Sequence, residues 1–171
     1  MALDCSAITV GADVFLDGGF EAQGTINLIR ADISGNLDLT GATLRKGCTA
    51  QGMRVGIWFI WRSLKSPGSA VDLFDAHVGT LMDQPGSWQP VKCLLLSSFR
   101  YDRIASEMDV AERLERLAKH DNSVLHFTPQ PYVQMANVLR QNGFAAEAAQ
   151  VLIRREDKQR AADWERAMDK V

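Results

Sequence analysis

The chain lacks most of the features by which an enzyme or a membrane-spanning protein is recognised from its sequence. Its 171 residues include only three cysteines and three histidines. They contain no C-x-x-C pair, no G-x-G-x-x-G or Walker-type loop, and no G-x-S-x-G elbow. The longest uninterrupted apolar run, 57–61, is far too short to span a bilayer. We therefore predict no catalytic residue, no metal site and no cofactor, and we favour a protein that is not an enzyme.

An excess of charge of one sign is also missing. The net charge is −2, and both the first 100 residues and the remainder are nearly neutral. This balance argues against a nucleic-acid partner, which requires a basic surface. The N-terminus shows no basic region followed by an apolar run, so we expect no signal peptide.

The few cysteines and histidines are expected to be structural. The odd number of cysteines predicts reduced thiols and a cytoplasmic protein, in which Cys5, Cys48 and Cys93 are inert packing residues. The spacing of His77, His120 and His126 matches no ligand set, and we expect structural or solvated roles for them.

Against these absences stands one strong positive feature, a short sequence that recurs between residues 3 and 55. Copies begin at five positions spaced by 11 or 12 residues: Leu3, Val14, Ile26, Leu37 and Cys48. Seven residues after each start an aliphatic side chain follows in four of the five copies, the exception being Glu21. A sixth copy begins at Val71. Similarity at a fixed period is typical of stacked repeat folds.

Within each copy, apolar and polar residues alternate, as in Ile26-Asn27-Leu28, which predicts a short strand with one buried face. Glycine, asparagine, aspartate and serine separate the strands and suit tight corners. Two copies, about 22 residues, would form one coil, and stacked coils would bury each other's apolar faces. We predict a right-handed parallel β-solenoid of pentapeptide-like type over residues 1–100, with its last strand at 91–96.

Residues 101–171 change to a helical period and are predicted to form an α-helical capping region. Asp109 and Glu112 make a capping box for a helix near 109–120. Thr128 and Pro129 begin a second helix that stops at Gly143, and a third continues from Ala145 to Lys170. The last two helices would form one αα-hairpin that covers the exposed strand edges at the end of the solenoid.

Several stretches resemble bacterial pentapeptide-like repeat proteins that have a helical C-terminal region. The similarity is carried by 15–24, 37–42 and 87–88 in the repeats, and by 99–104, 129–132, 138–140 and 151–153 in the tail. Those proteins are often labelled oxidoreductase or membrane-associated oxidoreductase, and longer members continue into membrane-spanning helices. The resemblance therefore implies a redox enzyme or a membrane-docked regulator as an alternative function.

Candidate partner-binding residues are the tryptophans Trp58, Trp61, Trp88 and Trp164 and the basic residues Arg154 and Arg155. Trp58 and Trp61 are three residues apart on one strand, so they cannot both point inward. The alternatives are that a loop or the helical cap covers the first three tryptophans and that 154–160 is a solvated stretch of helix. Repeat stacks build rigid surfaces more often than closed pockets, so we expect a non-enzymatic protein-interaction scaffold. Its partner is another protein or a second copy, whereas membrane contact rests on the resemblance alone.

Overall fold

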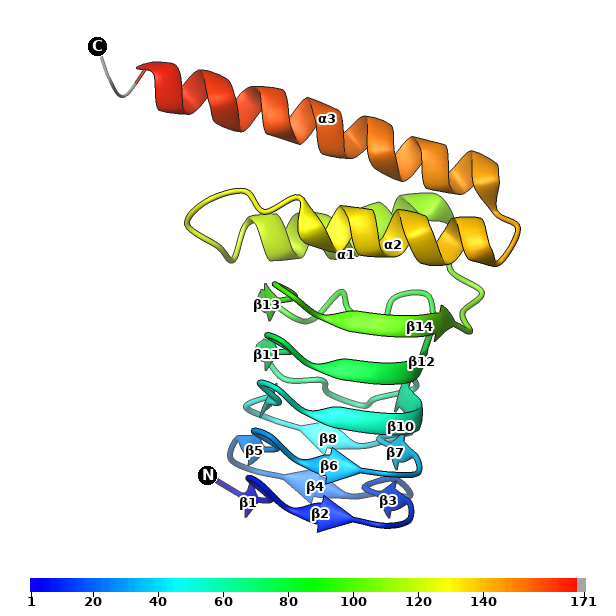
Figure 1. The fold of residues 1–171 in the computed structure, drawn as a ribbon. Helices are drawn as coiled ribbons and strands as arrows, with labels where there is room; N and C mark the ends of the chain where they lie inside the picture. The colour runs from blue at the N-terminus through cyan, green and yellow to red at the C-terminus, as the bar shows by residue number, and fades with distance from the viewer. Residues whose placement is uncertain (169–171) are drawn as a thin grey trace.

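The computed structural model describes residues 1–168, which form a parallel β-solenoid of about four coils followed by three α-helices (Figure 1). The N-terminus lies at one end of the stack, and the helices lie across the other end, with α3 (Ala145–Met168) as the outermost layer (Figure 1). The predicted order, a β-solenoid and then helices, is confirmed.

The strands of the first two coils are two residues long. They are β1 (Leu3–Asp4), β2 (Thr9–Val10), β3 (Val14–Phe15), β4 (Glu21–Ala22), β5 (Ile26–Asn27), β6 (Asp32–Ile33), β7 (Leu37–Asp38) and β8 (Thr43–Leu44). Later strands are β9 (Cys48–Thr49), β10 (Arg54–Trp61), β11 (Ala70–Asp72), β12 (His77–Asp83), β13 (Cys93–Leu95) and β14 (Arg100–Ile104). A strand of two residues gains stability only because the next coil pairs with it.

The register confirms that two copies of the repeat make one coil. Ile26 pairs with Leu3, Cys48 with Ile26, Val71 with Cys48, and Leu94 with Val71, all in parallel. One coil therefore takes 22 or 23 residues.

The same corner of every coil contains a residue in the left-handed region of backbone conformation. The five residues are Ala7 (φ 55°), Arg30 (φ 55°), Gly52 (φ 64°), Asp75 (φ 55°) and Ser98 (φ 60°). Only one of them is glycine, so side-chain hydrogen bonds must help to hold the turn. Asp4 accepts from the Ser6 N–H and Asp72 from the Phe74 N–H, which are local turns of the Asx kind.

The interior of the stack consists of the repeat positions. The apolar residues Ile26, Leu28, Leu37 and Leu39 are 0–3% exposed. Glu21 is exposed instead, and its neighbour Ala22 points inward and pairs with Leu44. An additional residue in the turn at Gly18 and Gly19 moves this strand by one position, which explains both the spacing of 12 and the exception.

From the third coil onward, longer strands replace pairs of short ones. The first half of β10 pairs with β6 and its second half with β7, and a bulge lies between Val55 and Trp58. The prediction that the last strand lies at 91–96 is wrong, because β13 is followed by β14, which pairs with β12. Two adjacent charged residues, Asp102 and Arg103, interrupt the apolar alternation there. For this reason β14 was not recognised from the sequence. The strand crosses the predicted division between residues 100 and 101.

The helices begin and end close to the predicted residues. The first, α1 (Val110–Asp121), has the predicted capping box, with Asp109 accepting from the Glu112 N–H at 2.9 Å. The second, α2 (Gln130–Gln141), packs against α3 as a hairpin, and Gly143 between them has φ 87°. Thr128 does not cap α2, because its hydroxyl contacts His120 instead. Lys170 and Val171 lie outside the described residues, and within 1–168 no helix is long and apolar enough to cross a membrane.

Side chains of α1, α2 and the turn between them form hydrogen bonds with the last coil of the solenoid. The alternate N–H groups of Leu94, Leu96 and Ser98 donate to Ser123 Oγ (2.9 Å), His120 Nδ1 (3.2 Å) and Gln130 Oε1 (2.9 Å), respectively. Gln134 Nε2 donates to the carbonyl oxygen of Tyr101 at 2.7 Å. The helices therefore supply partners to a strand edge that no further coil covers, which is how they cap the stack.

Candidate functional site

The junction between the last coils and the helices is the place where convergent polar groups occur. Asp83 at the end of β12 is fully buried, and its Oδ2 accepts from Trp88 Nε1 at 2.7 Å. The Arg116 guanidinium of α1 donates to the same oxygen and is itself almost fully buried. The arrangement is a buried ion pair, in which each charge depends on the other for its stability.

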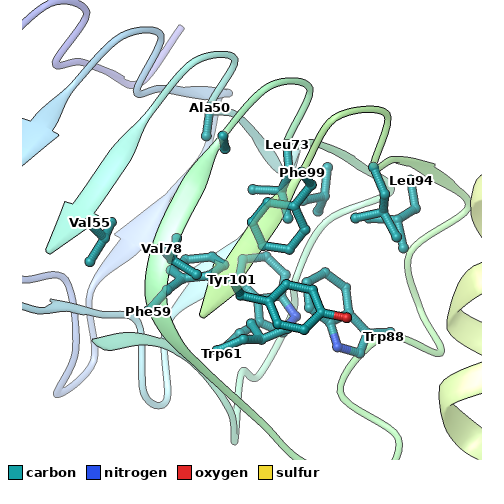
Figure 2. Packing of buried hydrophobic residues seen from close by; sticks show 14 of the residues in the cluster. Ala50, Val55, Phe59, Trp61, Leu73, Val78, Trp88, Leu94, Phe99 and Tyr101 are labelled. Carbon is teal, nitrogen blue, oxygen red and sulfur yellow. The ribbon is translucent and has the colours of Figure 1, made fainter. Parts of the chain in front are cut away.

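Aromatic rings surround this ion pair. Trp61 and Trp88 stack with their ring centroids 4.9 Å apart and their planes 14° apart. The Arg116 guanidinium lies 5.9 Å from the centroid of Trp88 and 6.0 Å from that of Tyr101, distances at which cation–π attraction operates. Figure 2 shows these rings crowded together inside the upper part of the solenoid.

The interior of the junction is filled rather than hollow. A cavity of about 10 Å³ is lined by Trp88, Leu96, Phe99, Tyr101, Arg116, Leu117, Pro131 and Gln134. This volume is about that of one water molecule. Burial raises the pKa of Tyr101, and burial together with the nearby Arg116 lowers the pKa of Arg113. A tyrosine shifted in this direction stays neutral, so it contributes packing and no readily available proton.

His120 is fully buried and has a defined tautomer. Its Nδ1 accepts from the Leu96 N–H, so its Nε2 must carry the proton and donate to Thr128 Oγ1 at 2.9 Å. Burial lowers the pKa of this histidine, which favours the neutral ring that the hydrogen bonds require. Its role is structural, as predicted.

Comparison with known proteins gives no relative. No protein-family model, no curated protein and no solved structure matches the chain.

The six residues predicted to bind a partner lie in three different places. Trp61 and Trp88 are 0% and 3% exposed and belong to the junction core. The prediction that these two tryptophans bind a partner is wrong, because the last coils and the helical cap cover them. The alternative, that they are covered within the chain, is correct for both. Trp61 closes the interior at the end of β10, and Trp88 comes from the loop between β12 and β13 and packs on it.

Trp58 lies on the side of the solenoid and is partly exposed, as the strand geometry required once Trp61 points inward. Its backbone N–H donates to Asn36 Oδ1 at 3.1 Å. The neighbouring Ile57 is 49% exposed. These two residues give the outer wall of the solenoid a small apolar surface.

The remaining three candidates lie on α3. Trp164 is 69% exposed, Arg154 is exposed, and Arg155 is partly exposed and pairs with Glu156. Arg154 and Trp164 are ten residues apart, which places them on different faces of the helix. The structure therefore does not bring the basic residues and the tryptophan into one site.

The sequence analysis missed the buried charges of the junction. The buried residues of α1 are Arg113, Arg116, Leu117 and His120. A signal was present, because Arg113, Leu117 and His120 recur at helical spacing. No sequence pattern, however, connects the two arginines with Asp83.

Two hollows lie on the surface of the helical region. One of about 860 Å³ separates the 121–127 segment from α3. Its inner end is Asp121, which accepts from the Tyr132 hydroxyl at 2.6 Å and lies 3.4 Å from Lys158 Nζ. Burial, and then the Asp121 carboxylate, raise the pKa of Tyr132 beyond its ordinary range. A second hollow of about 430 Å³ lies between the 106–113 segment and the start of α3.

Proposed function

We propose that the chain is a non-enzymatic scaffold for protein–protein interaction. The observation that carries this proposal is the filled junction. Convergent polar groups at this junction would favour an enzyme only if they faced a cleft. Instead, Asp83 Oδ2 pairs with Trp88 and Arg116, and the cavity beside them is only about 10 Å³.

The outer surfaces support the same proposal. Large apolar side chains that the core does not use are exposed on the solenoid wall and on α3, among them Ile57 (49%), Ile153 (62%) and Trp164 (69%). Exposed tryptophans and aliphatic residues are typical anchors at protein interfaces. A stack of coils holds such residues at fixed separations, because each coil is hydrogen-bonded to its neighbours.

The proposal has three further parts, which concern the type of repeat, the origin of the protein and its location in the cell. The coil of 22 or 23 residues with short strands and turn-rich corners supports a solenoid of pentapeptide-like type. That resemblance in turn supports a bacterial origin. The odd number of cysteines supports a cytoplasmic location.

The experiment is affinity capture from an extract of the native host with quantitative mass spectrometry. Wild-type chain is compared with Trp58→Ala and with the control Phe15→Ala, which removes a more exposed aromatic residue at the N-terminal end of the stack. The proposal expects at least one protein to be enriched by wild type and by the control, and to fall roughly tenfold or more with Trp58→Ala. Equal capture by all three chains would contradict the use of this surface.

The redox alternative has a direct test of its own. An absorbance spectrum of the native protein purified from its host would show flavin or haem bands if the chain carried such a group. Such bands would replace the scaffold proposal with a redox function. Binding to vesicles would likewise favour a membrane-docked regulator.

A further inference from the structure

The outer face of α3 carries exposed side chains that are apolar or of opposite charge. We define this face by five exposed residues with alternating separations of four and three: Ile153, Asp157, Arg160, Trp164 and Ala167. Residues with this alternation line one face of any helix, so the case for pairing depends on which side chains this face carries. The helix is fixed to the body by its first half, where Ala148 and Val151 are fully buried against the rest of the cap. The second half extends past this contact (Figure 1).

The charges on this face show which pairing is compatible with it. Two such helices in parallel would place Asp157 against Asp157 and Arg160 against Arg160, which is repulsive. Two antiparallel helices that cross near Ala162 would place Arg160 against Trp164 of the other copy, with Asp163 beside it. The same surface therefore carries a guanidinium and also the aromatic ring and carboxylate that a guanidinium prefers.

The existing contacts of these groups leave them available. Arg160 Nη1 lies 3.8 Å from Asp157 Oδ1, and both side chains are more than half exposed. Asp163 accepts from Arg166 at 2.9 Å, and both of these side chains are also more than half exposed. Exposed pairs of this kind contribute little, so exchanging them for contacts across a dimer costs little. Ala167 on this face is small, so it leaves room for the second helix.

We propose that the second half of α3 is the dimerisation surface of this protein, and that its occupant is the same segment of a second copy, packed antiparallel. This deepens the proposed scaffold function by naming one of its partners. Residues 157–168 span about 18 Å, and each Trp164 would bury roughly 150–250 Å². An interface of this size is smaller than the standard one, so the dimer is expected to be weak, with a dissociation constant in the micromolar range or above.

The test is sedimentation equilibrium of the full chain over a wide concentration range, with two charge variants. Arg160→Asp places two carboxylates together at each crossing, and Asp163→Arg places two guanidinium groups together there. Each variant alone is expected to dimerise at least about tenfold more weakly than wild type. An equimolar mixture of the two variants restores the opposite charges at both crossings, so it should form a heterodimer about as well as wild type forms a dimer.

The mixture separates an intermolecular contact from an effect on helix stability. A variant that had merely lost its own pairs within the helix would not be rescued by a second variant. Trp164→Ala should also weaken the dimer, whereas Phe144→Ala, immediately before the first residue of α3, should not. A monomeric wild-type chain at all concentrations, or a mixture that stays monomeric while wild type dimerises, would overturn the proposal. Either result would leave the capture experiment at Trp58 unaffected.

Discussion

At the scale of single residues, neighbouring positions of the repeat have different roles: one side chain packs in the interior and the next one stabilises the turn. Leu39 is 1% exposed and faces the interior, so Leu39→Ala should lower the free energy of unfolding by about 2–5 kcal/mol through the cavity that it leaves. Thermal or denaturant unfolding monitored by circular dichroism measures this loss.

Its neighbour Asp38 provides the matched comparison. Its side chain points away from the core, but Asp38 Oδ1 accepts from the Thr40 N–H at 2.8 Å. We therefore expect Asp38→Ala to cost about 0.5–1.5 kcal/mol, less than Leu39→Ala. Equal losses at the two positions would show that the strand register is wrong.

The three thiols should differ in reactivity. Cys48 is 4% exposed, and burial raises its pKa to about 12. Cys5 is half-buried, and Cys93 is exposed, so the expectation that all three are packed inside is wrong for Cys93. A thiol reagent at neutral pH should label Cys93 in the native chain and Cys48 after denaturation. Fast native labelling of Cys48 would contradict the structure around it.

At the scale of secondary-structure elements, the close approach of stacked coils constrains β10. A Cβ atom on Gly56 would lie 2.2 Å from the carbonyl oxygen of Ser34 in the coil below. Gly56→Ala should therefore lower the free energy of unfolding by about 1–3 kcal/mol or more. Gly11 has no atom within 4 Å of the corresponding position, and Gly11→Ala should be neutral or slightly stabilising. Similar melting temperatures for the two variants would refute this close approach.

The contact between α1 and β13 makes stability depend on pH through His120. Burial lowers its pKa below the ordinary value of 6.5, so the folded chain binds fewer protons than the unfolded chain as the pH falls. The contribution is fully present above about pH 6.5 and is lost as pH falls toward the folded pKa.

The unfolding free energy should therefore fall as the pH is lowered below about 6.5, and His120→Asn should flatten that dependence, since asparagine keeps an acceptor but does not titrate. His126→Asn, at an exposed position, is the control. Identical pH profiles for wild type and His120→Asn would disprove the assignment.

How well each element was predicted follows from where its stabilising partners lie in the sequence. The coils were predictable because each repeat carries its own apolar pair and turn residues, and the capping box of α1 because Asp109 and Glu112 are three residues apart. The junction was not, because Asp83 and Arg116 come from distant elements. Trp61 and Trp88 look the same in a sequence whether they face a partner or their own cap.

At the scale of the whole molecule, the chain is a β-solenoid whose upper edge is covered by its own helices. The central claim is that side chains of these helices and of the turn after α1 replace the missing coil as hydrogen-bond partners of the Leu94, Leu96 and Ser98 N–H groups. If that is correct, the junction is closed and the surfaces available to partners are the outer ones.

Amide hydrogen exchange, resolved by residue, tests this claim most directly. The account predicts that the N–H groups of Leu94, Leu96 and Ser98 exchange nearly as slowly as those of Leu28 and Leu73, which donate to the next coil. Ser123→Ala should accelerate exchange at Leu94, and Gln130→Ala should accelerate it at Ser98, each with little effect at Leu28. Fast exchange at all three positions in the wild-type chain would contradict the account, because it would mean that the helices do not cap the stack.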